Sequence, residues 1–203
     1  MTRSLLRIDG EPREESAFPH VWSACIGAGR ANEALRADWQ RQFAEVADTL
    51  KVKYVRFHGL FHDDMFVYRE SYGGGFGPNS PLPSPVHTFS YVDKVFDFLL
   101  EQGVRPFVEL GFMPRELATQ TETLFWWGAH CSPPKDMRRW SDLVTATVEH
   151  WIGRYGLDEV RQWRFEVWNE PNLVPPTSGP APRPSTSSCT RRACGPSRRS
   201  TPS

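Results

Sequence analysis

The segment SYVDKVFDFLLEQGVRPFVEL, residues 90–110, decides the fold, because it places a helix, a stop and a strand in direct succession. Four apolar residues recur at the spacing of one helical face: Val92, Val95, Phe96 and Leu99. Gly103 predicts the end of that helix. Residues 104–110 then predict a strand, which Pro106 weakens. The segment therefore reads as one helix–strand unit of an α/β protein.

The same alternation extends along the chain in both directions. Strands are predicted over residues 20–27, 52–58, 104–110 and 163–169. Helices are predicted over about 32–50, from a capping box at Ser90–Asp93 to Gly103, and around Trp140–Tyr155, closed by Gly156. A helix between every pair of strands implies a parallel sheet.

The loops of this pattern differ in length on the two ends of the strands. The connections that follow strands, roughly 59–88 and 111–137, are long, whereas those that follow helices are short. In α/β barrels the loops after the strands build the active face. The pattern therefore predicts a small-molecule site at the carboxyl ends of the strands. A doubly wound sheet has the same alternation of strands and helices, so this alternation alone does not distinguish it from a barrel.

Composition excludes several classes of protein. The 203 residues contain 24 Lys+Arg and 24 Asp+Glu, and this balance argues against a general nucleic-acid or membrane-surface binder. The first residues contain no apolar segment of the kind found in a signal peptide, and no run approaches a membrane span. Four cysteines are too few for a disulfide scaffold. We expect a reducing, cytoplasmic setting.

Residues 174–203 differ from the rest of the chain. They hold seven Pro, seven Ser and five Arg, with no acidic and no aromatic residue. Such a segment cannot bury enough apolar surface to offset the entropy of ordering, so we predict a disordered tail. We therefore divide the chain into a folded domain, residues 1–173, and the tail, residues 174–203. The abrupt change also suggests translation in a shifted reading frame or a damaged gene end.

The strongest chemical signal is FEVWNEPN, residues 165–172. Glu170 follows the last predicted strand, next to the amide Asn169 and close to Trp168, which could stack on a flat ligand. Partial burial beside aromatic rings would raise the pKa of this carboxyl, as a general acid requires. The alternative is a surface glutamate at a turn before Pro171.

This motif resembles the acid/base motif of retaining glycosidases with (β/α)8 barrels. The longer run WRFEVWNEPN is similar to glycoside hydrolase family 39, the β-xylosidases and α-L-iduronidases, and to its xylosidase branch in particular. Other stretches agree: YVRFHG at 54–59, FHDDM at 61–65, YVDKV at 91–95, FVELGFMP at 107–114, FWW at 125–127 and SPPKD at 132–136. The resemblance covers roughly 20–173 and implies an incomplete (β/α)8 TIM barrel, its first four strands.

The resemblance also implies roles for individual residues. Glu170 would be the general acid and then the base of a retaining hydrolase that removes terminal xylose from xylo-oligosaccharides or aryl xylosides. Asn169 would bind the sugar 2-hydroxyl and His58 another hydroxyl. Phe112 and Trp127 would line the sugar pocket. No metal or organic cofactor is implied, and neither nucleic acid nor membrane is an expected partner.

Plainer structural roles stay open for several of these residues. Strand alternation places Arg56 and His58 on one face, where both could form a buried polar cluster with Glu109 or Glu166. Phe112 could be ordinary core. At most one of the adjacent Trp126 and Trp127 is expected to face the site, and Asp63 and Asp64 are weaker candidates.

The sequence lacks the second carboxylate of this mechanism. Retaining enzymes place a nucleophile about 5–5.5 Å from the acid, and no Asp or Glu follows Glu170. In the family the nucleophile comes from the seventh strand, so we expect this chain to be inactive or nearly so. The alternatives are a non-catalytic sugar-binding remnant or an α-L-iduronidase-like hydrolase. Exposed sheet edges would favour self-association.

Overall fold

The computed structural model describes residues 19–71 and 84–171. The predicted tail, residues 174–203, and the glycine-rich run 73–77 lie outside this range. At the centre is a parallel sheet of four strands: β1 (Ile26–Arg30), β2 (Tyr54–His58), β5 (Arg105–Glu109) and β8 (Arg164–Glu166). In the described part of the chain, no helix is both long enough and apolar enough to cross a bilayer.

The order of the strands distinguishes between the two α/β architectures. The sheet runs β1-β2-β5-β8, so each parallel strand lies beside the one that precedes it in the chain. A doubly wound sheet reverses its order at a switch point, whereas a (β/α)8 barrel adds strands in sequence. The described sheet therefore has the arrangement of the first four strands of a barrel, as predicted.

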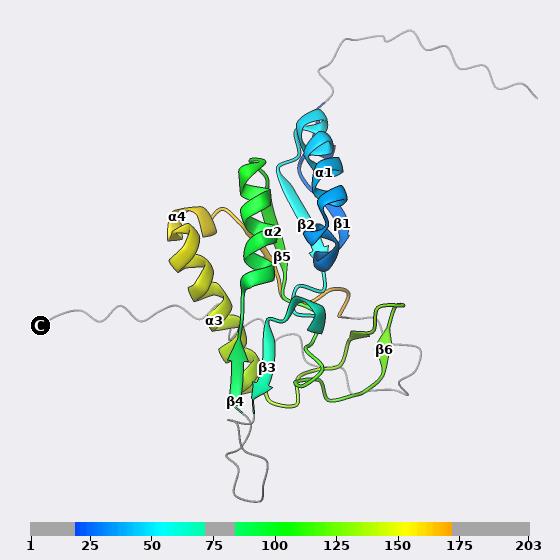
Figure 1. Ribbon diagram of the computed structural model, residues 1–203, viewed down its shortest axis with the longest axis vertical. Helices are drawn as coiled ribbons and strands as arrows, with labels where there is room; N and C mark the ends of the chain where they lie inside the picture. Colours follow the sequence, from blue (N-terminus) through cyan, green and yellow to red (C-terminus); the bar gives the residue numbers. More distant parts are fainter. Residues whose placement is uncertain (1–18, 72–83, 172–203) are drawn as a thin grey trace, which may run out of the picture.

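Helices follow the strands and pack along the sheet. They are α1 (Ala37–Leu50), α2 (Ser90–Glu101), α3 (Met137–Tyr155) and the short α4 (Leu157–Val160) (Figure 1). Asp136 begins α3 by accepting hydrogen bonds from the backbone N–H groups of Arg138 and Arg139 at 2.8 and 3.2 Å. The apolar faces of the three long helices join one core: Phe43, Ala47, Val92, Val95, Phe96, Leu99, Trp140, Leu143 and Trp151.

Alternation in β2 separates the two faces of the sheet. Val55 and Phe57 are buried in the helical core, whereas Tyr54, Arg56 and His58 are half-buried on the opposite face. We call the second face the open face, because no described helix covers it. The same alternation in β5 places Glu109 on the open face beside β2. Polar side chains therefore gather on one side of the sheet.

The two long loops after β2 and β5 contain small antiparallel hairpins that the sequence pattern did not predict. The first is β3 (Tyr68–Ser71) with β4 (Ser84–His87), and the second is β6 (Thr123–Leu124) with β7 (Ala129–His130). Figure 1 shows β3, β4 and β6 together at the lower end of the molecule. This end is the one that follows the carboxyl ends of the strands, where a site was expected.

The prediction of the first strand was wrong in its position. Residues 20–27 were expected to be extended, but Val21–Ser23 form a 3-10 turn and β1 begins at Ile26. The Ser23 hydroxyl donates to the carbonyl of His20 at 2.7 Å and closes the turn. The observed strand, IGAGR, carries two glycines, which disfavour a strand when judged by propensity alone.

Two predicted helix starts also differ from the structure. The helix expected from residue 32 is divided into a 3-10 helix, Ala31–Leu35, and α1, because Arg36 between them is extended. The capping box at Ser90 is absent: Phe89 precedes α2 without a side-chain hydrogen bond. The Asp93 carboxylate instead accepts from Nε2 of His150 on α3 at 2.7 Å. Tertiary pairing has replaced the local cap.

An ion pair at the amino end of β5 gives a pH-dependent contribution to stability. Hydrogen bonds from Arg105, at 2.8 and 3.0 Å, and from the Trp163 indole, at 3.0 Å, outweigh burial and lower the pKa of Glu159. Since the pKa is lower in the folded state, the stabilisation is present above the unfolded value of about 4.3 and is lost as pH falls through the folded value. We expect Glu159→Gln to destabilise the protein at pH 7, and the difference in unfolding free energy to shrink by pH 3. Urea titrations at both pH values measure it; an equal difference at both contradicts the prediction.

Candidate active site

Arg56 is the centre of a polar network on the open face. Its guanidinium contacts the Oε2 atoms of Glu166 and Glu109 at 2.7 and 2.8 Å. It also donates from Nη2 to Oδ1 of Asn169 at 2.8 Å. Burial alone would lower the pKa of Arg56, but the hydrogen bond to Glu166 and the two carboxylate charges outweigh it, so the pKa is raised. The arginine therefore stays charged and connects β2, β5 and the segment after β8.

His58 extends this network toward the mouth of the sheet. Its Nδ1 lies 2.7 Å from Oε2 of Glu109, the same oxygen that Arg56 contacts. The polar cluster that strand alternation left open for Arg56 and His58 is thus present, and it includes both Glu109 and Glu166. The His58 ring also stacks on Phe112, with centroids 6.0 Å apart and 28° between the planes. A substrate-binding role for His58 stays a prediction.

Glu109 is the most enclosed acid of the network. Its side chain is fully buried, and among the described residues Oε1 has no hydrogen-bond partner. A Cβ atom on Gly111 would lie 3.0 Å from that oxygen, so a larger residue at this position would crowd the carboxylate. Burial, and secondly the charge of Glu109, raise the pKa of the Cys131 thiol to about 11. Cys131 is therefore protonated at neutral pH.

Aromatic rings line the mouth of the open face beside His58. Phe112 contacts the rings of Trp127 at 5.6 Å, Phe125 at 6.1 Å and Trp168 at 5.8 Å between centroids. It is buried but lies outside the main hydrophobic core, and its role in sugar binding stays a prediction. We call Phe112, Phe125, Trp127 and Trp168 the aromatic cluster.

The two adjacent tryptophans lie in different environments, as expected. Trp127 is half-buried in the aromatic cluster and also packs against His62 at 5.0 Å. Trp126 is 85% exposed. Trp168, which the motif suggested as a stacking surface for ligand, packs instead on Phe112 and Trp140. Its ring therefore supports the pocket from within the protein.

Glu170 is placed differently from the sequence expectation. The expected burial beside aromatic rings does not occur: Glu170 is exposed and its backbone is left-handed, with φ 45°. The reason is that β8 ends at Glu166, so the alternation assumed as far as Glu170 stops four residues earlier. The same loss of pleating lets Asn169 reach Arg56, which regular alternation would have prevented. Asn169 and Glu170 thus both lie beyond the carboxyl end of β8.

Asp63 and Asp64 serve structural contacts. Asp63 accepts from the backbone N–H of Arg115 at 3.2 Å, Asp64 forms an ion pair with Arg30, and Nδ1 of His62 accepts from the backbone N–H of Asp64 at 3.4 Å. Both carboxylates therefore fasten the loop after β2. Within residues 19–71 and 84–171, no three His, Cys, Asp or Glu side chains are grouped so that they could hold a metal ion.

The close approach of Gly59 to Trp127 gives a test of the pocket wall. Gly59 has φ +70°, and a Cβ there would lie 3.2 Å from the Trp127 ring. We expect Gly59→Ala to lower the unfolding free energy by more than the ~1–2 kcal/mol that the left-handed backbone alone costs, and to shift the Trp127 indole resonance. Gly103→Ala is the matched control, because Gly103 has φ +71° and nothing within 4 Å. Equal losses in the two variants would show that the Trp127 contact is unimportant.

This arrangement has the parts of a carbohydrate site. A fixed amide and a histidine can bind hydroxyl groups, the aromatic cluster can take the apolar face of a sugar ring, and an exposed carboxyl lies next to the amide. The family model for "Glycosyl hydrolases family 39" matches residues 5–175. The chain belongs to this family.

The relatives of this chain include enzymes of both kinds that the motifs suggested. A β-xylosidase of Geobacillus stearothermophilus is 43% identical over 157 residues, which are 77% of this chain and 30% of that protein. An α-L-iduronidase of Mus musculus is 31% identical over 121 residues, 60% of this chain and 16% of that protein. The solved structure of a family 39 β-xylosidase from Caulobacter crescentus superposes with a TM-score of 0.68 at 36% identity, over 79% of this chain and 34% of that one. The family 39 chain described here thus spans about a third or less of each.

Sequence reasoning missed two residues of the candidate site. Arg30, at the end of β1, lies 5.0 Å from the Trp127 ring centroid and is paired with Asp64. Phe125 stacks on Trp127 at 5.5 Å and 14°. The FWW run 125–127 was a signal for Phe125. The first strand was predicted to end at residue 27, so Arg30 was not recognised as a residue at the carboxyl end of a strand.

Proposed function

We propose that this family 39 chain carries the acid/base half of a retaining β-xylosidase site. Glu170 donates a proton to the glycosidic oxygen as the leaving group departs, and its carboxylate then takes a proton from the attacking water. Asn169 binds the sugar 2-hydroxyl and His58 a neighbouring hydroxyl, while Phe112 and Trp127 contact the ring. The substrate class is xylo-oligosaccharides and aryl xylosides.

The observation that supports this proposal best is the continuous network from His58 through Glu109 and Arg56 to Asn169. Every link is 2.7 or 2.8 Å long. Because Arg56 donates to Oδ1 of Asn169, the Nδ2 group faces away from the arginine and can donate to a sugar oxygen. An amide fixed in this orientation is what a 2-hydroxyl contact requires. Glu170 is the next residue in the chain, so the hydrogen bond to Asn169 also restrains the backbone position of Glu170.

The nucleophile is not offered by the described carboxylates. Glu109 is fully buried, and Glu166 is paired with Arg56 at 2.7 Å. A retaining mechanism needs an attacking carboxylate about 5–5.5 Å from the acid, and the sequence has none after Glu170. We propose that the 203-residue chain alone binds xylosides with little or no turnover, and that a carboxylate from another polypeptide segment completes the site.

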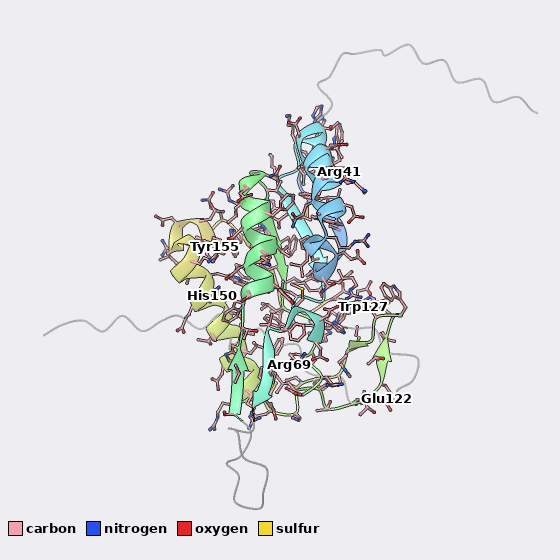
Figure 2. The ribbon with its side chains drawn as sticks, viewed as in Figure 1. Arg41, Arg69, Glu122, Trp127, His150 and Tyr155 are labelled. Atoms are coloured by element: carbon pink, nitrogen blue, oxygen red, sulfur yellow. The ribbon has the colours of Figure 1, made fainter. Side chains whose placement is uncertain are left out.

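The test is the release of aryl alcohol from a chromogenic aryl β-xyloside by the full 203-residue chain. Turnover that disappears in Glu170→Gln, and persists in the control Glu122→Gln, supports a functional acid/base. Figure 2 shows Glu122 at the end of the β6 segment away from Trp127, and this residue is exposed, as Glu170 is. Turnover unaffected by Glu170→Gln contradicts the proposed role. Binding of xylose with little or no turnover is the result that we expect for the 203-residue chain alone.

The choice between xylosidase and iduronidase chemistry is tested with the same samples. The greater identity to the β-xylosidase, 43% against 31%, favours xylosides. We expect binding of xylose to exceed binding of iduronic acid in parallel titrations. The reverse order would assign the chain to iduronidase-like chemistry.

The open edges of the sheet support a proposal of self-association. Within the described residues, β1 and β8 each have a strand neighbour on one side only. Unpaired backbone groups at such edges attract other chains. We expect the weight-average mass in sedimentation equilibrium to rise with concentration. A monodisperse monomer over a hundredfold concentration range contradicts it.

A further inference from the structure

Trp126 is the most exposed large apolar side chain of the described residues, at 85%. It lies in the turn between β6 and β7, where the N–H of Gly128 donates to the carbonyl of Phe125 at 3.2 Å. Phe125 has φ 60°, an unfavourable conformation for a bulky residue. A strained turn thus carries three consecutive aromatic residues, of which Phe125 and Trp126 are exposed and Trp127 is half-buried.

Arg30 holds this exposed indole from the protein side. Its guanidinium carbon lies 5.3 Å from the Trp126 ring centroid and 5.0 Å from that of Trp127. The Arg30 side chain is only 14% exposed and forms an ion pair with Asp64. A cation over an aromatic ring is attracted to its π face. Trp126 is therefore anchored, and its large exposed surface is available to a ligand.

The exposed indole adjoins the aromatic cluster. Arg30 contacts both tryptophans, and Phe125, next to Trp126, stacks on Trp127. In Figure 2 Trp127 lies on the part of the β6 segment that is nearer the sheet. A chain of sugars that enters the pocket through this rim would pass the Trp126 ring.

We propose that Trp126 is a second sugar platform, which stacks on a pyranose ring of a xylo-oligosaccharide beyond the ring in the pocket. This rests on the proposed function, because it takes the pocket to hold the first xylose. Xylopyranose carries no exocyclic hydroxymethyl group, so its C–H face can lie flat on an indole. The platform makes the chain selective for oligosaccharides over the monosaccharide.

The test compares D-xylose, xylobiose and xylotriose as ligands of the full 203-residue chain. Binding is followed through the indole N–H resonances of the ¹⁵N-labelled protein. We expect xylotriose to bind about fivefold to tenfold more tightly than xylose, the gain of one aromatic stacking contact. Trp126→Ala should bring that ratio close to one. Trp22→Ala is the control, because Trp22 is also exposed but precedes β1, at the opposite end of the sheet, and should leave the ratio unchanged.

The outcomes separate the platform from the pocket. Xylose binding with no gain for xylotriose, or a gain that Trp126→Ala leaves intact, overturns the platform and leaves the proposed function standing. Xylotriose binding that depends on Trp126 and not on Trp127 supports the platform and contradicts the pocket. Failure to bind either sugar overturns both. Self-association that Trp126→Ala abolishes, without any effect on sugar binding, assigns the surface to a second copy and also overturns the platform.

Discussion

Replacement of Arg56 by methionine should lower the free energy of unfolding by about 3–5 kcal/mol, the range for breaking a buried ion pair. Methionine replaces the aliphatic part of the arginine side chain but removes the charged guanidinium. Glu109, with no exposed side-chain surface, would then retain only His58 as a partner among the residues that the structure describes. Glu166 and Asn169 would each lose the contact that connects them to β2. The loss arises because burial of an unpaired carboxylate is expensive.

Two further variants separate charge from geometry. Arg56→Lys keeps the charge but cannot hold three partners with a planar fork, so it should be intermediate. Arg56→Met combined with Glu109→Gln removes the unpaired charge and should recover part of the loss. A double-mutant cycle over these two residues measures their coupling.

The measurement is urea unfolding followed by far-UV circular dichroism at pH 7. Arg161→Met is the matched control, because Arg161 is 68% exposed and its contact with Asp158 is 3.7 Å long. Such surface pairs contribute about 0–1 kcal/mol. Similar losses in Arg56→Met and Arg161→Met would show that the network does not stabilise the fold.

Periodicity predicted well those helices and strands whose buried residues recur at a regular spacing in the sequence. The apolar residues predicted for one face of α2 are all buried in the core, as are Trp140, Leu143 and Trp151 of α3. In β2 the alternation of Val55 and Phe57 with Arg56 and His58 predicted the two faces of the sheet. The order of the strands in the sheet, by contrast, could not be predicted from the alternation of helices and strands. It became clear only from which strands pair in the structure.

The prediction failed where local signals were weaker than tertiary contacts. The β1 strand carries two glycines and is held by pairing with β2, so propensity placed the start of the strand six residues too early. The strands β6 and β7 have two residues each, too few for a pattern. Asp93 looked like a capping residue, yet its partner is His150, 57 positions away in sequence.

The candidate site shows the same division. Strand alternation predicted that Arg56 and His58 share a face, because the side-chain period fixes it, and the polar cluster with Glu109 or Glu166 that it left open is present in the structure. It could not predict where β8 ends, and the exposure of Glu170 depends on that point. Arg30 was missed because its role depends on two rings that lie about a hundred residues later.

Replacement of Trp151 by alanine should lower the free energy of unfolding by about 3–5 kcal/mol, the range for removal of a buried aromatic side chain. Trp151 is fully buried in α3. Its ring contacts Phe96 on α2 at 5.3 Å, Trp163 at 5.6 Å and Phe165 on β8 at 6.3 Å. The resulting cavity would loosen β8, and with it the segment that brings Asn169 to Arg56.

The indole of Trp151 also makes Trp151→Phe informative. Among the described residues its Nε1 has no hydrogen-bond partner, although the atom is buried. Phenylalanine removes this unsatisfied donor, whose burial costs about 1–3 kcal/mol, while it keeps most of the apolar ring. We expect the loss for Trp151→Phe to be less than half of that for Trp151→Ala. Trp126→Ala serves as the control for removing an indole, and should change stability by no more than about 0.5 kcal/mol because its ring is exposed. If Trp151→Phe and Trp151→Ala are equally destabilising in urea titrations, the indole N–H must have a partner and the volume argument for this site is wrong.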